Sequence, residues 1–262
     1  MRISAHMVVK NEDKWIWYSL MSVLDYVDEI MVWDTGSIDK TVEIIKSIDN
    51  PKIKFRQRLV SNAQDLTSAR QVMLSATKAD WLMILDGDEI WPEKALVESI
   101  SKLDNSLNFL VNKFWNLAGD VYHYQPDNAG KYRIGKHTGH LTIRFINLNK
   151  YKNLKYMSDY PLEGLTNNNK TLIQNDINSN YNFVTAPYLH ATHLERSNLA
   201  WNSNTHRNIQ KIELGDKIPD NFEYPKCLYI PGPNNPWEKR SWSFVLNAMW
   251  QTPLREIKRN LG

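Results

Sequence analysis

Residues 79–89 read ADWLMILDGDE, and this stretch decides the fold that we expect for the 262-residue chain. An apolar run from Trp81 to Leu85 ends abruptly in Asp86, Asp88 and Glu89. A short apolar run bounded by charge predicts one buried strand. Open α/β sheets bind ligands at the carboxyl ends of their strands, so acidic side chains at this point predict a binding site.

The three carboxylates of this stretch repel one another unless a cation or a proton lies between them. Oxygen ligands suit Mg²⁺ or Mn²⁺, which commonly join protein carboxylates to substrate phosphates. The stretch therefore predicts a divalent-metal site for a phosphorylated substrate, and a solvated acidic turn is the alternative. Glu89 could support the other carboxylates from behind or lead the next helix, where the helix dipole favours a negative charge, and we prefer the second interpretation.

The composition is that of an ordinary globular protein, with 42% hydrophobic and 23% charged residues. The length suits one large α/β domain. A net charge of +3 is too small to indicate nucleic-acid binding. The lone Cys227 excludes an internal disulfide and is interpreted as a structural thiol. We see no secretory signal and no apolar run that could span a bilayer, so we predict a cytoplasmic protein.

Strand and helix signals alternate through the first part of the chain. We expect strands at 3–9, 29–33, 53–56 and 81–85, and helices at 11–26, 37–45, 66–76 and 92–103. The sequence DTGS at 34–37 predicts a turn, and Ser37 or Asp39 could cap the helix that follows. This alternation predicts an α/β fold with a mostly parallel central sheet and helices on both faces.

The pattern changes after residue 105 and predicts a mixed β/α half. We expect strands at 109–115, 120–124 and 141–147, loops at 125–139 and 167–182, helices at 197–214 and 241–250, and an irregular surface segment at 219–236. Trp242, Val245, Leu246 and Met249 recur at helical spacing, so we expect them to dock the last helix on the domain.

The usual phosphate-binding loops are missing from the sequence. No GxGxxG follows the first expected strand, and no GxxxxGK[ST] occurs anywhere. A dinucleotide-dependent oxidoreductase and a P-loop enzyme are therefore disfavoured. The phosphates of a nucleotide would instead meet a metal at the acidic turn, with help from an Arg or a Lys.

Four motifs stand in a fixed order: MVVKNE at 7–12, VWDTGSIDKT at 32–41, SAR at 68–70 and LDGDE at 85–89. In this order and spacing the chain resembles the family 2 glycosyltransferases, which have the GT-A (Rossmann-like) fold and use nucleotide-activated sugars. The resemblance implies one GT-A domain over 1–262, with a nucleotide-sugar-binding half at 1–104 and an acceptor-binding half at 105–262.

The resemblance also implies roles for residues of these motifs. Asp34 would recognise the base, Glu12 would lie near the nucleoside, and Arg70 would support the nucleotide. In the D-x-D motif, Asp86 would contact the ribose or metal-bound water, and Asp88 would bind the metal that bridges the diphosphate. From the residues alone, Asp34 could instead be an Asx-turn residue that caps the next helix, and Arg70 could be a surface residue of its helix.

A catalytic base is expected from a branch of the family typified by lipopolysaccharide-core enzymes, in which an R-L-F strand is followed by an H-E turn. IRFI at 143–146 resembles the strand, and YPLEGL at 160–165 resembles the turn, with Leu162 where the branch has His. Glu163 is thus the candidate base for an inverting transfer, and Asp159 is the reserve. A solvent-exposed loop Glu is the alternative.

The segment YLHATHLERS at 188–197 also resembles this branch, in which an Arg-Asn helix follows, as HRN does at 206–208. His190 and His193 are candidates for a further metal ligand. Side chains three apart on a strand point to opposite faces, so we expect only one of them to bind, and we prefer His193 because it is nearer the loop end. Arg196 is a candidate partner of the diphosphate.

Together these expectations describe a metal-dependent hexosyl- or deoxyhexosyltransferase. It would use Mn²⁺ or Mg²⁺ and a nucleotide-diphosphate sugar, with UDP as the expected nucleotide, and a glycan or lipid-linked saccharide as acceptor. Alternatives are a nucleotidyltransferase that forms sugar nucleotides and a non-catalytic carbohydrate- or nucleotide-binding protein of the same fold. Arg255, Lys258 and Arg259 would add at most a weak peripheral attraction to the cytoplasmic face of a membrane.

Overall fold

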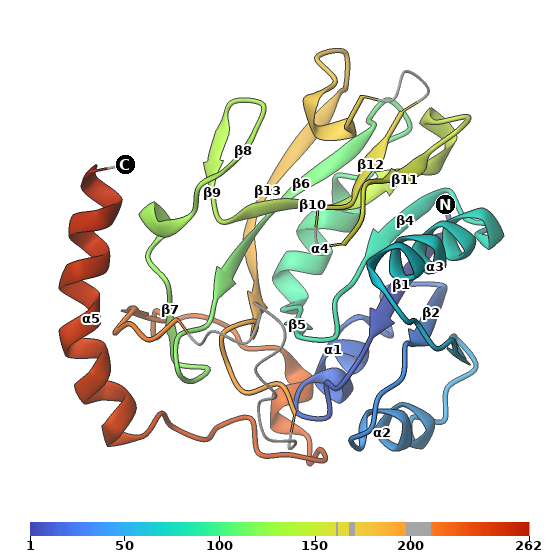
Figure 1. Cartoon of the computed structure of the whole chain (residues 1–262). Helices are drawn as coiled ribbons and strands as arrows, with labels where there is room; N and C mark the ends of the chain where they lie inside the picture. Colours follow the sequence, from blue (N-terminus) through green and yellow to red (C-terminus); the bar gives the residue numbers. More distant parts are fainter. Residues whose placement is uncertain (161, 168–170, 198–210, 262) are drawn as a thin grey trace.

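A computed structural model describes residues 1–160, 162–167, 171–197 and 211–261 of the chain. Its centre is an eight-stranded sheet in the order β3-β2-β1-β4-β10-β6-β13-β5 (Figure 1). The strands are β1 (Ile3–Val9), β2 (Glu29–Asp34), β3 (Ile53–Gln57), β4 (Trp81–Ile84), β5 (Glu89–Ile90), β6 (Phe109–Asn116), β10 (Leu141–Asn147) and β13 (Tyr181–His190).

Strands β3, β2, β1 and β4 are parallel neighbours, as the alternating pattern predicts. The helices between them are α1 (Ile16–Val23), α2 (Thr41–Ser47) and α3 (Ala63–Ala76), and α4 (Glu93–Ser101) follows β5. Helix α4 begins directly after Pro92, whose fixed φ suits a helix start. The expected α/β class with a mostly parallel sheet is confirmed, and helix ends differ from the expected ones by a few residues.

The second half of the chain completes the same sheet. Strand β10 runs antiparallel to both β4 and β6, and β13 runs parallel to β6. The carboxyl ends of β1, β2, β4, β6 and β13 therefore meet at one edge of the sheet. This edge is where the acidic turn emerges.

The core has a layer on each face of the sheet. Side chains of α1, α2 and α4 pack with Ala5, Met7 and Met83 on one face. On the other face, α3 contacts Trp33, and the hairpin β11 (Lys155–Met157) and β12 (Gly164–Thr166) covers strands β6 and β10. Helices thus lie on both faces, as expected, and alternate side chains of β4 enter opposite layers.

The loops after β1 and β2 are joined by side-chain hydrogen bonds. Asn11 has φ 54°, a left-handed conformation that Asn tolerates well. Its backbone N–H donates to Ser37 Oγ at 2.8 Å, and its Oδ1 accepts from Ile38 N–H at 2.9 Å. The first two sequence motifs therefore form one rigid corner beside the acidic turn.

Several expectations for the second half are wrong in detail. The expected strand at 120–124 is reduced to β7 (His123–Tyr124), because Asp120 Oδ1 accepts from Tyr122 N–H at 3.0 Å and turns the chain. The expected loop at 125–139 contains the 3₁₀ turn η1 (Asp127–Ala129) and a hairpin of β8 (Tyr132–Ile134) and β9 (His137–Gly139). In the expected loop at 167–182, a 3₁₀ turn, η3 (Ile173–Asn175), precedes β13. The expected helix at 197–214 falls mostly on residues 198–210, outside the described residues, and 211–214 are not helical.

The surface segment at 219–236 is anchored by the short turn η5 (Lys226–Tyr229). Cys227 is buried there, its Sγ donates to the backbone oxygen of Tyr18 at 3.6 Å, and burial raises its pKa to about 12. These contacts support the interpretation of Cys227 as a structural thiol. Strand β14 (Asp216–Lys217) pairs with β7 just before this segment.

The last helix, α5 (Trp242–Leu261), is twice as long as expected and faces the other way. Pro253 lies inside it although proline removes a helical hydrogen bond. Of the four residues expected to dock the helix, only Val245 is partly buried. Trp242, Leu246 and Met249 are 83%, 61% and 56% exposed, so most of the apolar face points away from the domain. The docked face contains the fully buried Ala248. Within the described part of the chain, no helix combines the length and apolarity needed to cross a membrane.

Candidate active site at the carboxyl edge of the sheet

The acidic turn between β4 and β5 is fixed by three neighbours. Ser19 Oγ on α1 donates to the backbone oxygen of Asp86 at 2.9 Å, and Ala191 N–H donates to the backbone oxygen of Asp88 at 2.8 Å. A Cβ at Gly87 would lie 3.2 Å from Glu12 Cγ and from Val9 Cγ2. A side chain at position 87 would require Glu12 or Val9 to shift by a few tenths of an ångström, so the turn packs closely against the loop after β1.

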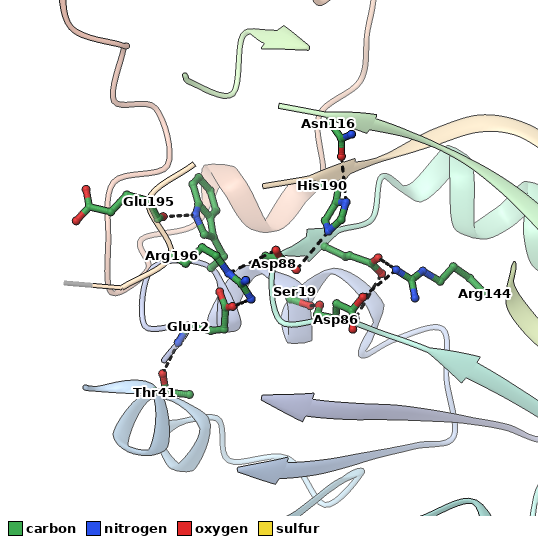
Figure 2. Close-up of polar contacts among 12 residues, drawn as sticks. Glu12, Ser19, Thr41, Asp86, Asp88, Asn116, Arg144, His190, Glu195 and Arg196 are labelled. Atoms are coloured by element: carbon green, nitrogen blue, oxygen red, sulfur yellow. Dashed lines mark hydrogen bonds and ion pairs between the residues drawn. The ribbon is translucent and has the colours of Figure 1, made fainter. Parts of the chain in front are cut away.

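Asp86 and Glu89 share one cation, Arg144, in the middle of β10 (Figure 2). Arg144 Nη2 lies 2.9 Å from Asp86 Oδ2 and also contacts Glu89 Oε1, while its Nε donates to Tyr188 Oη at 3.1 Å. Glu89 is fully buried in β5, and burial raises its pKa to about 7 against the opposing effect of Arg144. The interpretation of Glu89 as a helix-leading charge is wrong, because α4 begins only at Glu93.

Asp88 points the other way, toward the end of β13. It is 2% exposed, and its Oδ1 lies 3.5 Å from His190 Nε2. His190 Nδ1 lies 3.1 Å from Asn116 Oδ1, which fixes the ring with Nε2 toward Asp88. Burial lowers the pKa of His190, but the charge and hydrogen bond of Asp88, together with the charge of Glu89, outweigh burial, so the pKa is raised overall.

Glu12 and Arg196 complete this side of the turn. The Arg196 guanidinium contacts the buried Glu12 carboxylate, and its Nε lies 3.6 Å from Asp88 Oδ2. The Glu12 backbone N–H donates to Thr41 Oγ1 at 2.7 Å, which ties the loop to the start of α2. Figure 2 shows Glu12, Asp88 and His190 arranged around the acidic turn with Arg196 between the two carboxylates. The predicted Glu12, Asp88 and Arg196 therefore come together.

Asp34 lies at the end of β2 and is fully buried. Its carboxylate accepts hydrogen bonds from Gly36 N–H and Ser37 N–H, each at 3.2 Å. It therefore holds its own turn, and a contact with a nucleotide base stays a prediction.

Arg70 and Glu163 form a second pair at the rim. Arg70 Nε lies 3.5 Å from Glu163 Oε1, and both side chains are mostly buried, at 14% and 11% exposure. Asp159 is exposed on the loop before Glu163. The catalytic roles of Glu163 and Asp159 stay predictions.

His193 follows the end of β13 and lines the same pocket as the acidic turn. Among the described residues, neither ring nitrogen has a hydrogen-bond partner. Burial, followed by the nearby cations Lys211 and Arg255, lowers its pKa to about 3, so the ring is neutral. His190, rather than the preferred His193, is the histidine placed against Asp88.

A pocket of about 1380 Å³ opens at the acidic turn. Its wall includes Glu12, Arg70, Asp88, His190 and Arg196 at the sheet edge, and it extends to residues of α5. Pockets for one small ligand commonly measure ~300–1,000 Å³. The volume therefore leaves room for two substrates.

The residues at Asp88 fit a divalent cation bound together with a phosphorylated substrate. No group of three or more His, Cys, Asp or Glu side chains suited to a metal occurs within the described ranges. Mg²⁺ is usually held by only one or two protein carboxylates, with water and substrate phosphates supplying the other ligands. Asp88 and His190 offer one carboxylate and one imidazole, and Asn116 orients His190 as outer partners of metal-bound histidines do.

Sequence reasoning missed Arg144, Asn116 and Ser19. Arg144 did carry a signal, because a charged residue inside the apolar run 141–147 must find a partner once the strand is buried. Asn116 and Ser19 carried none, since their function depends on which strand and helix lie beside the turn.

Comparison with known proteins identifies a family. A model described as Glycosyl transferase family 2 matches residues 4–158. The chain is 34% identical over 122 residues to a TPR repeat-containing protein of Synechococcus elongatus, covering 46% of this chain and 29% of that protein. It is 30% identical over 150 residues to the SPbeta prophage-derived glycosyltransferase SunS of Bacillus subtilis, covering 56% of this chain and 31% of SunS. The matched region thus spans less than a third of either relative.

Solved structures with partial similarity include glucosyl-3-phosphoglycerate synthase of Mycobacterium tuberculosis in complex with Mn²⁺ and UDP-glucose. It is 22% identical, with a TM-score of 0.35 over 44% of this chain and 43% of that one. Residues 1–349 of TarS from S. aureus are 19% identical, with a TM-score of 0.41 over 56% and 47% of the two chains.

Proposed function

The chain belongs to glycosyl transferase family 2, and from that premise we propose that it moves a sugar from a nucleotide-diphosphate sugar to an acceptor hydroxyl. The observation that carries this proposal is the meeting of Asp88, His190 and Arg196 in one large pocket at the carboxyl edge of the sheet. Ligands of open α/β sheets bind at this edge.

We assign the donor diphosphate to the neighbourhood of Asp88. Asp88 and His190 would hold Mn²⁺ or Mg²⁺, and Arg196 would turn its guanidinium to a phosphate oxygen. A bound divalent cation supplies positive charge to the departing diphosphate. Asp86 is oriented by Arg144 and would face the ribose side of the donor.

We assign the nucleoside to the rigid corner formed by the loops after β1 and β2. Glu12 and Arg70 line the pocket there, and Asp34 stabilises the turn below it. A uracil N3–H would suit a carboxylate acceptor, so UDP is our proposed nucleotide, although thymine and guanine present similar groups.

We assign the general base to Glu163, with Asp159 in reserve. Glu163 contacts Arg70, and Arg70 and Tyr160 line the pocket. A carboxylate at this rim is suited to take the proton of an acceptor hydroxyl while that oxygen attacks the anomeric carbon, which inverts the configuration. The finer proposal of a lipopolysaccharide-core-type branch rests on the sequence resemblance of the IRFI strand at 143–146 and the YPLEGL turn at 160–165.

The proposed function is tested by ligand binding and then by chemistry. The first test measures the Tm of the chain with UDP-, GDP- and dTDP-sugars, each with and without Mn²⁺. The sugars of one nucleotide should raise the Tm, and only when Mn²⁺ is present. Slow hydrolysis of that donor without acceptor should follow. A chain that binds none of these donors would contradict the proposal.

The assignment of the base has its own test. Glu163→Gln should lower kcat for transfer about 10²–10⁴-fold with little change in donor affinity. Glu238→Gln, at an exposed position outside the pocket, is the matched control. Wild-type kcat in Glu163→Gln, or retention of the anomeric configuration in the product, would contradict the assignment.

A further inference from the structure

The pocket has a second charged region, made of cations. Its wall includes Lys131, Lys211, Arg255, Lys258 and Arg259, which we call the basic end. Three of them lie on α5, and Lys131 precedes β8. Helix α5 stands at the left of Figure 1, and β1 and β2 lie toward the right, so the helix that carries three of these cations is on the other side of the molecule from the nucleoside corner.

The basic end has few counterions. Arg259 pairs with the buried Glu213, which also accepts from Gln125 Nε2. Arg255 Nη2 donates at 3.2 Å to Gln251, a neutral group, and its buried Nε has no hydrogen-bond partner among the described residues. The acidic residues in the described pocket wall are Glu12, Asp86 and Asp88, all at the sheet edge.

The sequence just before Lys211 adds no acidic residue that could offset the positive charge. Residues 198–210, which precede Lys211, contain no Asp or Glu. The α5 dipole favours cations in the last turn, which explains Lys258 and Arg259. It does not explain why Arg255, Lys131 and Lys211 line the same wall.

The cations of the basic end help to lower the pKa of neighbouring groups. Burial and then the cations Arg255 and Arg259 lower the pKa of Lys211, against the opposing effect of Glu213. Burial lowers the pKa of His140, and Lys211 and Arg259 contribute to the shift. The like charges destabilise one another, so an anion bound among them would be stabilised.

We propose that the basic end binds an anionic group, a phosphate or a carboxylate, on the acceptor. The inference rests on the proposed function and adds the chemical class of the second substrate. The donor diphosphate is assigned to Asp88 and Arg196, so these cations are available to another anion. The Arg255 guanidinium suits bidentate binding of phosphate or carboxylate.

The first experiment measures binding by calorimetry at constant ionic strength. Glycerol 3-phosphate should bind the wild-type chain saturated with UDP and Mn²⁺, and glycerol should not. Arg255→Gln/Lys258→Gln should weaken this binding about tenfold or more, since each charged hydrogen bond is worth roughly that factor. Its affinity for UDP with Mn²⁺ should stay that of wild type.

Two variants serve as controls. Lys54→Gln/Lys94→Gln removes the same charge from exposed sites outside the pocket and should bind glycerol 3-phosphate like wild type. Arg255→Lys keeps the charge and should retain most of the affinity, which separates charge loss from misfolding. Vesicles of phosphatidylglycerol, set against phosphatidylcholine, show whether a phosphate carried by a lipid also binds.

The outcomes separate the two proposals. The proposal of an anion site at the basic end would be overturned if wild type did not bind glycerol 3-phosphate, or if Arg255→Gln/Lys258→Gln bound it with equal affinity. Binding of UDP with Mn²⁺ would then still support the transferase. Failure of UDP–Mn²⁺ to bind, with glycerol 3-phosphate binding that depends on Arg255 and Lys258, would support the anion site and remove the proposed function.

Discussion

The acidic turn and helix α5 place charges of opposite sign on one pocket, and the two regions hold them differently. At the turn, Asp86 and Glu89 contact Arg144, and Asp88 lies beside His190 and Arg196. On α5, Arg259 pairs with the buried Glu213, but Arg255 donates to the neutral side-chain amide of Gln251, and the apolar side of the helix is exposed. Buried charges thus need partners from distant strands, whereas charges on a surface helix can rely on water or a ligand.

Removing the central cation of the turn should have the largest effect. Arg144→Met leaves the buried Glu89 and its neighbour Asp86 without their cation, which should lower the free energy of unfolding by about 3–5 kcal/mol. Urea unfolding measures it. Arg133→Met, at an exposed position on β8, should change it by less than about 0.5 kcal/mol. Equal losses in both variants would show that the turn does not depend on Arg144.

Asp88→Asn tests the other side of the turn, where we expect function rather than stability to suffer. The amide keeps the shape but not the charge, so kcat/KM for transfer should fall about 10²–10³-fold or more. The Tm should remain near that of the exposed control Asp220→Asn. Wild-type turnover by Asp88→Asn would remove Asp88 from the donor site.

The titration of Glu89 should make the free energy of unfolding depend on pH. Its pKa is raised from 4.5 to about 7 in the folded chain, so its contribution is fully present below about pH 4.5 and is lost as pH rises through 7. Relative to Glu89→Gln, the wild-type free energy of unfolding should fall by up to about 3 kcal/mol between pH 5 and pH 8. Parallel pH profiles for the two proteins would contradict this.

The smallest effect is expected on the outer face of α5. Leu246→Ser/Trp250→Ser should change the free energy of unfolding by less than about 0.5 kcal/mol, because both side chains are mostly exposed. Ala248→Leu, on the docked face, should cost about 1–3 kcal/mol through overpacking. If the serine variant were the more damaging one, the apolar face would be covered in solution.

The sequence predicted the first half of the fold well. Strand β1 and the starts of β2, β3 and β4 match the apolar runs, because a buried parallel strand shows its pattern locally. The α/β GT-A fold expected from four ordered motifs is confirmed by the parallel β3-β2-β1-β4 order and the family match. The docking of helix α5 was harder to predict, because helical spacing indicates that one face is apolar but not that this face is buried.

The sequence by itself determined that carboxylates follow β4 and that they belong to a family 2 glycosyltransferase. Only the tertiary structure decided their partners. Arg144 reaches Asp86 and Glu89 because β10 lies beside β4, and His190 reaches Asp88 because β13 ends at the same edge. The physical reason is that strand and turn formation depend on neighbours in sequence, whereas compensation of a buried charge depends on neighbours in space.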